Sequence, residues 1–384
     1  MSIYLDNAAT TKPKKEVVEA MMPYLMDKWH NPSALYSEAS KIKKDIESAR
    51  KTIGKFINAN GNEIFFTSSG SESNCWAIQG FVNHCIARGK NPCVITSTIE
   101  HKSVIECVDN LNNINVHYIG VDKNGFVNIA QLRNVLFHAA TICEEEVLVS
   151  IQFANNEIGT IQHIKEIAEE VHRFGGVFHT DAVQAFGHVQ IDVKDLDVDM
   201  LTASGHKVGC PKGIGILYKK DSVSINPLIY GSQMDGMRGG TENVPYIMGM
   251  SKAVELLQED DEYQLRMTVL RNNFISQLKS LGCSVNGSIE DRLCNNINIT
   301  FFQNISGESM VYMLDTCGIY VATGSACNSH EITASYVLKA IGLSDEDAHK
   351  TIRITLSDDI TMDEIDEAVQ EMKKQIMLLS MDNE

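Results

Sequence analysis

Residues 63–80 read EIFFTSSGSESNCWAIQG, and the organisation of the chain follows from this stretch. Its first residues form a short apolar run that predicts a buried strand, and its last ten have the length and composition of a helix. Small residues join the two, so Gly70, Ser71 and Glu72 fall where the helix begins. Backbone N–H groups at such a junction can bind a phosphate, but the same junction is common in α/β proteins without that role.

The alternation of strand and helix continues from about residue 60 to residue 220. This pattern indicates βαβ units and predicts a mostly parallel sheet covered by helices, one of which falls within residues 161–174. In such a sheet, ligands bind where loops and helix N-termini follow the carboxyl ends of the strands. The predicted strands are EIFFTS, CVITSTI, NVHYIGV, EVLVSIQF, GVFHTDAV, VDMLTAS and IGILYKK.

The pattern changes after Gly249 and predicts a smaller α+β domain, with a long helical stretch near 250–281, a strand at NNINITF and two further helices. In the last helix, Thr361 and Glu364 form a capping box. Five apolar residues at helical spacing are expected in the core: Met362, Ile365, Val369, Met372 and Ile376. We expect a large domain of residues 15–250 and a small domain of residues 1–14 and 251–384.

The composition is that of a globular protein, because 43% of the 384 residues are hydrophobic and 22% are charged. A net charge of −17 argues against a nucleic-acid partner. The N-terminal residues show no signal-peptide or transit-peptide pattern, and no apolar run is long enough to cross a bilayer, so we expect a cytoplasmic protein. Ten cysteines without CxxC pairs indicate buried thiols rather than a disulfide framework.

One lysine stands out in ASGHKVGCPKGIGILY, residues 203–218, because it lies between two predicted strands with no acidic neighbour. Taken alone, Lys207 reads as a surface lysine, since lysine is rarely buried. In a dry pocket, however, desolvation lowers the pKa of the amine and makes it a nucleophile towards carbonyls. A Schiff-base lysine needs this chemistry.

Other groups that a pyridoxal phosphate (PLP) imine needs occur in the same alternating region. Asp181 ends a predicted strand and can hold the ring nitrogen protonated, although such an aspartate is also often a helix cap. Gln184 follows three residues later and can donate to the ring oxygen. His101 precedes a predicted helix, where it is either structural or a proton carrier stacked on the ring.

These residues belong to a series of motifs that resembles the NifS/IscS-like cysteine desulfurases of the class V, fold type I PLP enzymes. The resemblance spans residues 3 to about 370, and nine motifs in the family's order are more specific than any one of them. The motifs are YLDNAATT, FTSSGSES, IEHKSV, NNEIG, HTDAVQ, SGHKVGCPKGIG, MRGGT, TGSAC and IRITLS. The resemblance implies an α/β fold type I transferase, with a large domain built on a mostly parallel sheet and a smaller α+β domain.

The resemblance also implies a role for each matching residue. Lys207 would form the Schiff base, His101 would stack on the ring and move protons, and Thr241 would reach the phosphate bound by a neighbouring subunit, which implies a homodimer. Asn156 and Gln184 would contact the oxygen side of the ring. The implied cofactor-binding residues are Gly70, Ser71, His101, Asn156, Asp181, Gln184, Ser204, His206, Lys207 and Thr241.

Cys327, in VATGSACNSHEITASYVL, distinguishes the sequence from an aminotransferase. Small residues before it and polar residues after it predict an exposed loop in which a thiolate can form. In the family's mechanism such a thiolate attacks the sulfur of the substrate cysteine, which leaves an enzyme persulfide and releases alanine. The segment from Thr323 to Tyr336 resembles the longer-loop, group I branch. Cys327 and His330 are only two ligands, so we expect no metal site.

Two residues match substrate positions of the family: Arg353 for the substrate carboxylate and Asn31 in HNPSALY. Without the motif, Arg353 would read as a surface ion pair on an edge strand. Three residues depart from the family pattern. Cys75 stands where the family usually has a polar residue, Ala334 replaces a frequent proline, and Asp358 replaces a frequent glycine.

The sequence therefore predicts a PLP-dependent cysteine desulfurase that converts L-cysteine to L-alanine and supplies sulfur for iron–sulfur clusters or thiolation. The expected partners are L-cysteine, a second subunit and a sulfur-acceptor or scaffold protein. A selenocysteine lyase or another class V lyase or aminotransferase is the second hypothesis. A PLP-fold protein that only binds a partner is the third.

Overall fold

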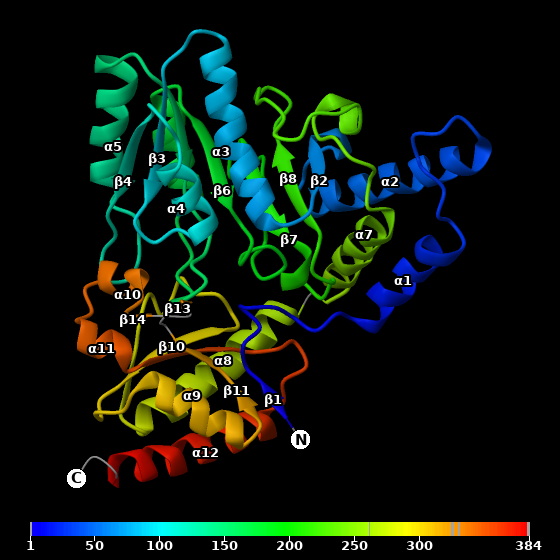
Figure 1. Ribbon diagram of the computed structural model, residues 1–384. Coiled ribbons are helices and arrows are strands. Elements are labelled where there is room, and N and C mark those ends of the chain that lie inside the picture. The colour runs from blue at the N-terminus through cyan, green and yellow to red at the C-terminus, as the bar shows by residue number, and fades with distance from the viewer. Residues whose placement is uncertain (1, 261, 324–325, 329–330, 382–384) are drawn as a thin grey trace.

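The computed structural model describes the backbone of residues 2–260, 262–323, 326–328 and 331–381, and the side chains of these residues except 326–328, 331–333 and 381. Within these residues the largest element is a seven-stranded sheet, which Figure 1 shows above a smaller sheet. The strands of the large sheet, in spatial order, are β2 (Ile64–Thr67), β8 (Gly215–Lys219), β7 (Met200–Ser204), β6 (Val177–Asp181), β5 (Glu146–Ser150), β3 (Pro92–Ser97) and β4 (Asn115–Ile119).

The strands of the large sheet fall within the runs predicted from the sequence, except that β3 begins one residue earlier, at Pro92, and the sheet is mostly parallel as predicted. The exception is β8, which is antiparallel to both of its neighbours, β2 and β7. Because β2 and β7 are both antiparallel to β8, they run in the same direction as each other. The carboxyl ends of β2, β3, β5, β6 and β7 therefore meet at one edge of the sheet, where a ligand site is expected.

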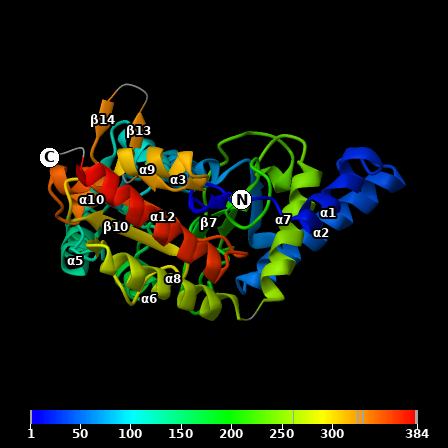
Figure 2. The same ribbon diagram turned by 90° about the horizontal axis from the view of Figure 1, so that it is seen from below.

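Helices cover both faces of the large sheet. Successive side chains of a strand point to opposite faces, and apolar side chains on each face pack against helices. In β3, Val94 packs in the cluster with α3 and α4, whereas Cys93 and Ile95 pack on the other face with α2, α5, α6 and α7. The helices of this half, labelled in Figure 1 or, for α6, in Figure 2, are α1 (Lys15–Met26), α2 (Ser37–Phe56), α3 (Gly70–Ala87), α4 (Lys102–Asp109), α5 (Ile129–Phe137), α6 (Ile164–Arg173) and α7 (Val244–Gln258).

The smaller sheet is antiparallel and has its own apolar core. Its strands, in spatial order, are β12 (Ala322–Thr323), β15 (Thr351–Thr355), β10 (Asn296–Phe301) and β9 (Cys283–Val285). Figure 2 shows three helices beneath it, α8 (Tyr263–Ser280), α9 (Gly307–Thr316) and α12 (Met362–Met381). The remaining elements of this half are α10 (Tyr336–Ala340), α11 (Asp345–His349) and the pair β13 (Ala326–Asn328) and β14 (Glu331–Thr333).

The N-terminal residues contact both the small-sheet half and the large-sheet half. Strand β1 (Ile3–Tyr4) pairs parallel with β11 (Ile319–Tyr320), and Ile3 and Leu5 lie in the core of the small sheet. The chain then crosses to the large half, where Thr11 N donates to the carbonyl oxygen of His206 at 2.9 Å. We call residues 6–11 the N-terminal strap.

The second half differs from the sequence prediction in several places. The helical stretch predicted near 250–281 is two helices, α7 and α8, because four consecutive acidic residues at 259–262 follow α7, where negative charge opposes the helix dipole. The sequence predicted two helices after β10, but the described residues contain α9, α10, α11 and α12. Elements as short as α10 and α11 carry too little periodicity to be recognised.

The last helix begins as predicted. Thr361 N donates to Glu364 Oε2 at 2.8 Å, and Glu364 N donates to Thr361 Oγ1 at 3.2 Å. Four residues of the predicted apolar stripe are buried: Ile365, Val369, Met372 and Ile376. The placement of Met362 in the core was wrong, because its side chain is 36% exposed in the first turn, before the helix reaches the core.

The predicted domain limits, 15–250 and 1–14 with 251–384, stay a prediction. Helix α7 crosses residue 250 without a break and packs against α1 and α2. No helix among the described residues is both long enough and apolar enough to span a membrane.

Candidate active site

The sequence predicted that Gly70, Ser71 and Glu72 lie where a helix begins, and they form the first turn of α3. Ser69 caps the helix by accepting a hydrogen bond from Glu72 N at 3.1 Å. A Cβ atom at Gly70 would lie 2.7 Å from a methyl group of Val183 and 3.5 Å from Cβ of Ser204, so glycine allows β6 and β7 to approach the helix closely. Ser71 is exposed in the first turn. Free N–H groups and the helix dipole favour a phosphate here.

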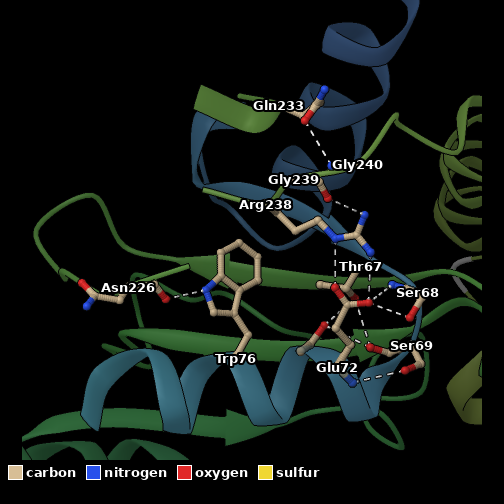
Figure 3. A network of polar contacts seen from close by, with 11 residues as sticks. Thr67, Ser68, Ser69, Glu72, Trp76, Asn226, Gln233, Arg238, Gly239 and Gly240 are labelled. Atoms are coloured by element: carbon tan, nitrogen blue, oxygen red, sulfur yellow. Dashed lines mark hydrogen bonds and ion pairs between the residues drawn. The ribbon is translucent and has the colours of Figure 1, made fainter. Parts of the chain in front are cut away.

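The carboxylate of Glu72, in the first turn of α3, forms an ion pair with Arg238 (Figure 3). Arg238 donates to it twice, from Nε at 2.9 Å and from Nη2 at 3.2 Å, and Ser68 donates from N at 2.7 Å. Burial raises the pKa of Glu72, but these hydrogen bonds outweigh burial and leave the pKa below its ordinary value. The ion pair therefore neutralises a charge that would repel a phosphate.

A polar network that is buried at Asn74 and Asp181 extends to His101 at the surface. Asn74 Nδ2 donates to Asp181 Oδ2 at 2.7 Å and to Ser103 Oγ at 2.9 Å. The Ser103 hydroxyl lies 2.8 Å from His101 Nδ1, which also accepts a hydrogen bond from Ser103 N at 3.1 Å. Because Nδ1 is an acceptor, the neutral ring carries its proton on Nε2. Val183 N fixes the other oxygen of Asp181 at 2.9 Å.

Lys207 follows β7 in a single 3₁₀ turn, and its amine meets the N-terminal strap. Nζ donates to the carbonyl oxygen of Ala8 at 2.5 Å and to that of Ala9 at 3.0 Å. Burial lowers the pKa of Lys207 to about 8, with a further lowering by Arg353, while Asp6 and Asp181 act in the opposite direction. No carboxylate pairs directly with this amine among the described side chains, as its sequence context suggested.

Other predicted cofactor residues surround Lys207. Gln184 Nε2 donates to the same Ala8 carbonyl at 3.0 Å. His206 Nδ1 lies 3.2 Å from Thr10 Oγ1, and burial lowers the pKa of His206 to about 4, so its ring is neutral near pH 7. His101 lies within electrostatic reach of both Asp181 and Lys207, and desolvation lowers the pKa of its ring. The structure thus brings His101, Asp181, Gln184, His206 and Lys207 together.

Arg353 reaches the site from the small sheet. It lies on β15, which is an inner strand between β12 and β10 rather than the edge strand considered above. Its Nη1 donates to the carbonyl oxygen of Asn156 at 3.2 Å, and its Nη2 forms an ion pair with Asp6 Oδ1 at 2.7 Å. Asn156 and Arg353 therefore belong to one cluster, with Asp6 of the strap between the two halves.

The side chain of Cys327 lies outside the described residues, and so does His330. The backbone of Cys327 pairs with that of Ile332 in the β13–β14 hairpin. The chain after this hairpin is anchored at the site, because Tyr336 OH donates to the carbonyl oxygen of Glu100, next to His101, at 2.5 Å. The roles of Cys327 stay a prediction.

Two predicted residues stay apart from this cluster within one chain. Asn31 is exposed between α1 and α2, where its Oδ1 accepts a hydrogen bond from Ser33 N at 2.9 Å. Thr241 is exposed just before α7, after the segment that Arg238 ties to α3. An exposed Thr241 agrees with the expected role towards a second subunit, but that role is untested.

The three departures from the family pattern lie at different places. Cys75 is half-buried on α3, with Sγ 3.8 Å from the carbonyl oxygen of Ser103. Ala334 packs against the small apolar cluster of α10. Asp358 forms an ion pair with Lys14 at 2.7 Å, so its carboxylate is engaged away from Arg353.

Sequence reasoning did not identify Asp6, Asn74 or Ser103 as site residues. The motif YLDNAATT held a signal for Asp6, since an aspartate in a short polar segment has no helix or strand to explain it. Asn74 and Ser103 gave no signal, because each lies inside a predicted helix and faces the site only when α3 and α4 pack together.

Comparisons with known proteins agree with this geometry. Residues 3–368 match the family described as Aminotransferase class-V. The chain is 44% identical to cysteine desulfurase IscS of Methanosarcina thermophila, over 96% of this chain and 90% of that protein.

Solved structures of related proteins are also similar to this chain in sequence and in fold. A NifS-like protein matches with a TM-score of 0.90 and 33% identity, over 99% of this chain and 100% of that chain. SspA in complex with cysteine matches with a TM-score of 0.81 and 36% identity, over 92% and 99%. This chain belongs to the aminotransferase class-V family and, within it, to the PLP-dependent cysteine desulfurases of the NifS/IscS type.

Proposed function

We propose that this enzyme removes sulfur from L-cysteine, releases L-alanine and receives the sulfur on Cys327 as a persulfide. The persulfide would then supply iron–sulfur cluster assembly or the thiolation of another biomolecule. The observation that carries the proposal is that the amine of Lys207, whose pKa is lowered to about 8, lies together with His101 and Asp181 at the edge where the parallel strands of the large sheet end.

The residues present fit pyridoxal phosphate. The amine of Lys207 would hold the aldehyde carbon, and Asp181, fixed by Asn74 and Val183, would hold the ring nitrogen. The phosphate would bind at the N-terminus of α3, which packs closely against Val183 and Ser204 because residue 70 has no Cβ. When bound, this cofactor supplies an electron sink for the negative charge that develops at the substrate's α-carbon.

The remaining residues would complete the phosphate and ring sites. Gly70, Ser71, Ser204 and His206 would hold the phosphate, and Asn156 and Gln184 would contact the oxygen side of the ring. A neutral His206 donates one hydrogen bond without competing for protons, since its pKa lies near 4.

Proton movement would depend on Lys207 and His101. A lowered pKa leaves an appreciable share of Lys207 as free amine near neutral pH, so it can accept the proton from the α-carbon. His101 has its Nδ1 engaged by Ser103, so its Nε2 is the atom free to donate or accept a proton. Lys207 would thus accept the proton of the α-carbon at Nζ, and His101 would exchange a proton at Nε2.

Sulfur transfer would take place between the substrate and Cys327. Arg353 would bind the substrate carboxylate, with Asn31 as a further substrate residue. The Cys327 thiolate would form a bond to the substrate sulfur as the carbon–sulfur bond breaks. The electron pair of that bond would stay with the alanine fragment, which gains a proton from His101. The SspA structure with bound cysteine supports cysteine as the substrate.

We also propose a homodimer in which Thr241 reaches the cofactor phosphate of the neighbouring subunit. Apolar side chains gather near the connection between α1 and α2, where a second copy could cover them: Met22, Leu25, Met26, Trp29, Leu35 and Tyr36. A sulfur-acceptor or scaffold protein would take the sulfur from Cys327.

The test is incubation of the PLP-loaded enzyme with L-cysteine, followed by mass spectrometry of the intact protein and its peptides. We expect one additional sulfur on the peptide that contains Cys327, together with alanine in solution. Cys327→Ser should retain the cofactor's visible absorbance and lose persulfide formation, and Lys207→Ala should lose that absorbance. Cys143→Ser, which changes an exposed thiol elsewhere, is the control. Turnover retained by Cys327→Ser would exclude Cys327 as the sulfur acceptor.

A further inference from the structure

Asp6 is the residue that stands opposite Arg353. Its Oδ1 accepts from Arg353 Nη2 at 2.7 Å, and both side chains are mostly buried, with exposed fractions of 22% for Asp6 and 12% for Arg353. The guanidinium makes one other hydrogen bond among the described residues, from Nη1 to the carbonyl oxygen of Asn156. Its Nε is buried and has no hydrogen-bond partner among them.

The position of Asp6 is fixed by its backbone. Residue 6 pairs with Thr355 of β15, two residues after Arg353, and Asn7 N donates to the carbonyl oxygen of Thr355 at 3.3 Å. Tyr4 OH donates to the carbonyl oxygen of Asp6 at 3.0 Å. Arg353 is part of β15, and Asp6 is paired with the same strand through its backbone. These backbone contacts hold Asp6 beside Arg353.

This placement has a consequence for ligand binding. Nε is buried, so an incoming carboxylate can bond only the hydrogens of Nη1 and Nη2 that Asn156 and Asp6 leave free. Asp6 orients those hydrogens, and its negative charge cancels part of the positive charge that attracts the carboxylate. Orientation favours binding, whereas charge cancellation weakens it.

We propose that Asp6 is a positioning residue that sets how tightly Arg353 holds an amino-acid carboxylate, keeping the affinity low enough for the product to leave. The proposal rests on the proposed function, in which Arg353 binds the substrate carboxylate. It follows that removal of the charge of Asp6, with its hydrogen bond retained, strengthens the binding of amino acids that have a carboxylate. Ligands without a carboxylate are unaffected.

The test compares Asp6→Asn with the unchanged enzyme, both loaded with PLP. The affinities for L-alanine and for cysteamine, which lacks the carboxylate, are measured from the change in the cofactor's absorbance. We expect Asp6→Asn to bind L-alanine about tenfold more tightly and cysteamine within about twofold of the unchanged enzyme. The KM for L-cysteine should fall, and kcat should fall with it if product release limits turnover.

Three further variants separate the possible outcomes. Asp6→Ala loses the orienting hydrogen bond as well and should bind L-alanine less tightly than Asp6→Asn. Asp359→Asn removes the same charge from an exposed residue near β15 and should change neither affinity. Asp6→Asn that binds L-alanine with unchanged or lower affinity would overturn the proposal, and so would an equal change for cysteamine.

Arg353→Gln distinguishes this failure from a failure of the proposed function. If Arg353 binds the carboxylate, Arg353→Gln weakens L-alanine binding and leaves cysteamine binding unchanged. If Arg353→Gln has no effect on L-alanine, the substrate assignment of Arg353 is wrong, and the role of Asp6 falls with it, while persulfide formation on Cys327 still tests the desulfurase activity on its own.

Discussion

The two sides of the site are held together by different means. On the large-sheet side, Asp181 and His101 are connected through the buried Asn74, and His179 lies fully buried between Ser150 and Thr202 of neighbouring strands. On the small-sheet side, Arg353 depends on the N-terminal strap, which is fixed by a few hydrogen bonds and by the ion pair of Asp6 with Arg353.

The difference shows which parts of the site are rigid. Residues at the ends of paired strands are placed by the sheet, so their positions are fixed before a ligand arrives. The strap is a single segment that crosses between two apolar cores, so its contacts decide how the two sides approach each other. Changes on the large-sheet side should therefore cost more than changes at the exposed contacts of the strap.

The largest effect is expected from Asn74→Ala. Asn74 donates to both Asp181 and Ser103 from a buried position, so its loss leaves a buried carboxylate oxygen without its donor. We expect kcat/KM for L-cysteine to fall by about 100-fold, which corresponds to about 2.7 kcal/mol. The pH profile of kcat should also shift, because the Ser103 hydroxyl, which contacts His101 Nδ1, loses the hydrogen bond from Asn74 that orients it. Asn83→Ala, on the exposed face of α3, is the matched control. A loss of less than about threefold would show that the network does not position the catalytic groups.

A smaller effect is expected from His179→Gln, and it should depend on pH. Burial lowers the pKa of His179 from 6.5 to about 3 in the folded protein, so the neutral ring stabilises the fold above pH 6.5, and this stability is lost as the pH falls towards 3. Between pH 7 and pH 5 the loss is about 2 kcal/mol. The free energy of unfolding of His179→Gln, measured in denaturant, should therefore fall less over this interval.

A comparison at two pH values isolates His179 from the other histidines whose pKa is lowered by burial, His101, His188 and His206. His188, whose pKa burial lowers to about 4, contributes a similar acid-dependent loss in both proteins. Equal pH dependence of the variant and the unchanged enzyme would mean that His179 is protonated or exposed in the folded protein.

The smallest effect is expected from Asp358→Gly, which restores the residue common in the family. The ion pair of Asp358 with Lys14 joins side chains that are 45% and 32% exposed, and exposed pairs contribute little. Thermal unfolding should change by less than about 0.5 kcal/mol, and the KM for L-cysteine should stay within about twofold. A tenfold change in KM would place Asp358 in the electrostatics of Arg353 and would contradict the separation seen here.

Much of the large-sheet half could be predicted from the sequence because its signals are local. Each strand is a run of β-branched or apolar residues; Asp181 ends one such run, and His101 and Lys207 each follow another within a few residues. The short elements around β10 were missed, because strands of two or three residues have no measurable period. The break between α7 and α8 was also missed, since helical spacing continues on both sides of the acidic residues.

By itself, the sequence determined the order of the main elements, the edge of the large sheet at which ligands bind, and the residue types that meet there. These features are local, because each strand and the residues that follow it are adjacent in the chain. Only the tertiary structure decided that Asp6 faces Arg353 from 347 residues away, that Asn74 reaches Asp181 and Ser103, and that carbonyl groups of the strap meet Lys207. Such contacts depend on how two cores and several helices pack. Packing brings together side chains that are far apart in the sequence, and the residues next to them in the sequence do not indicate these contacts.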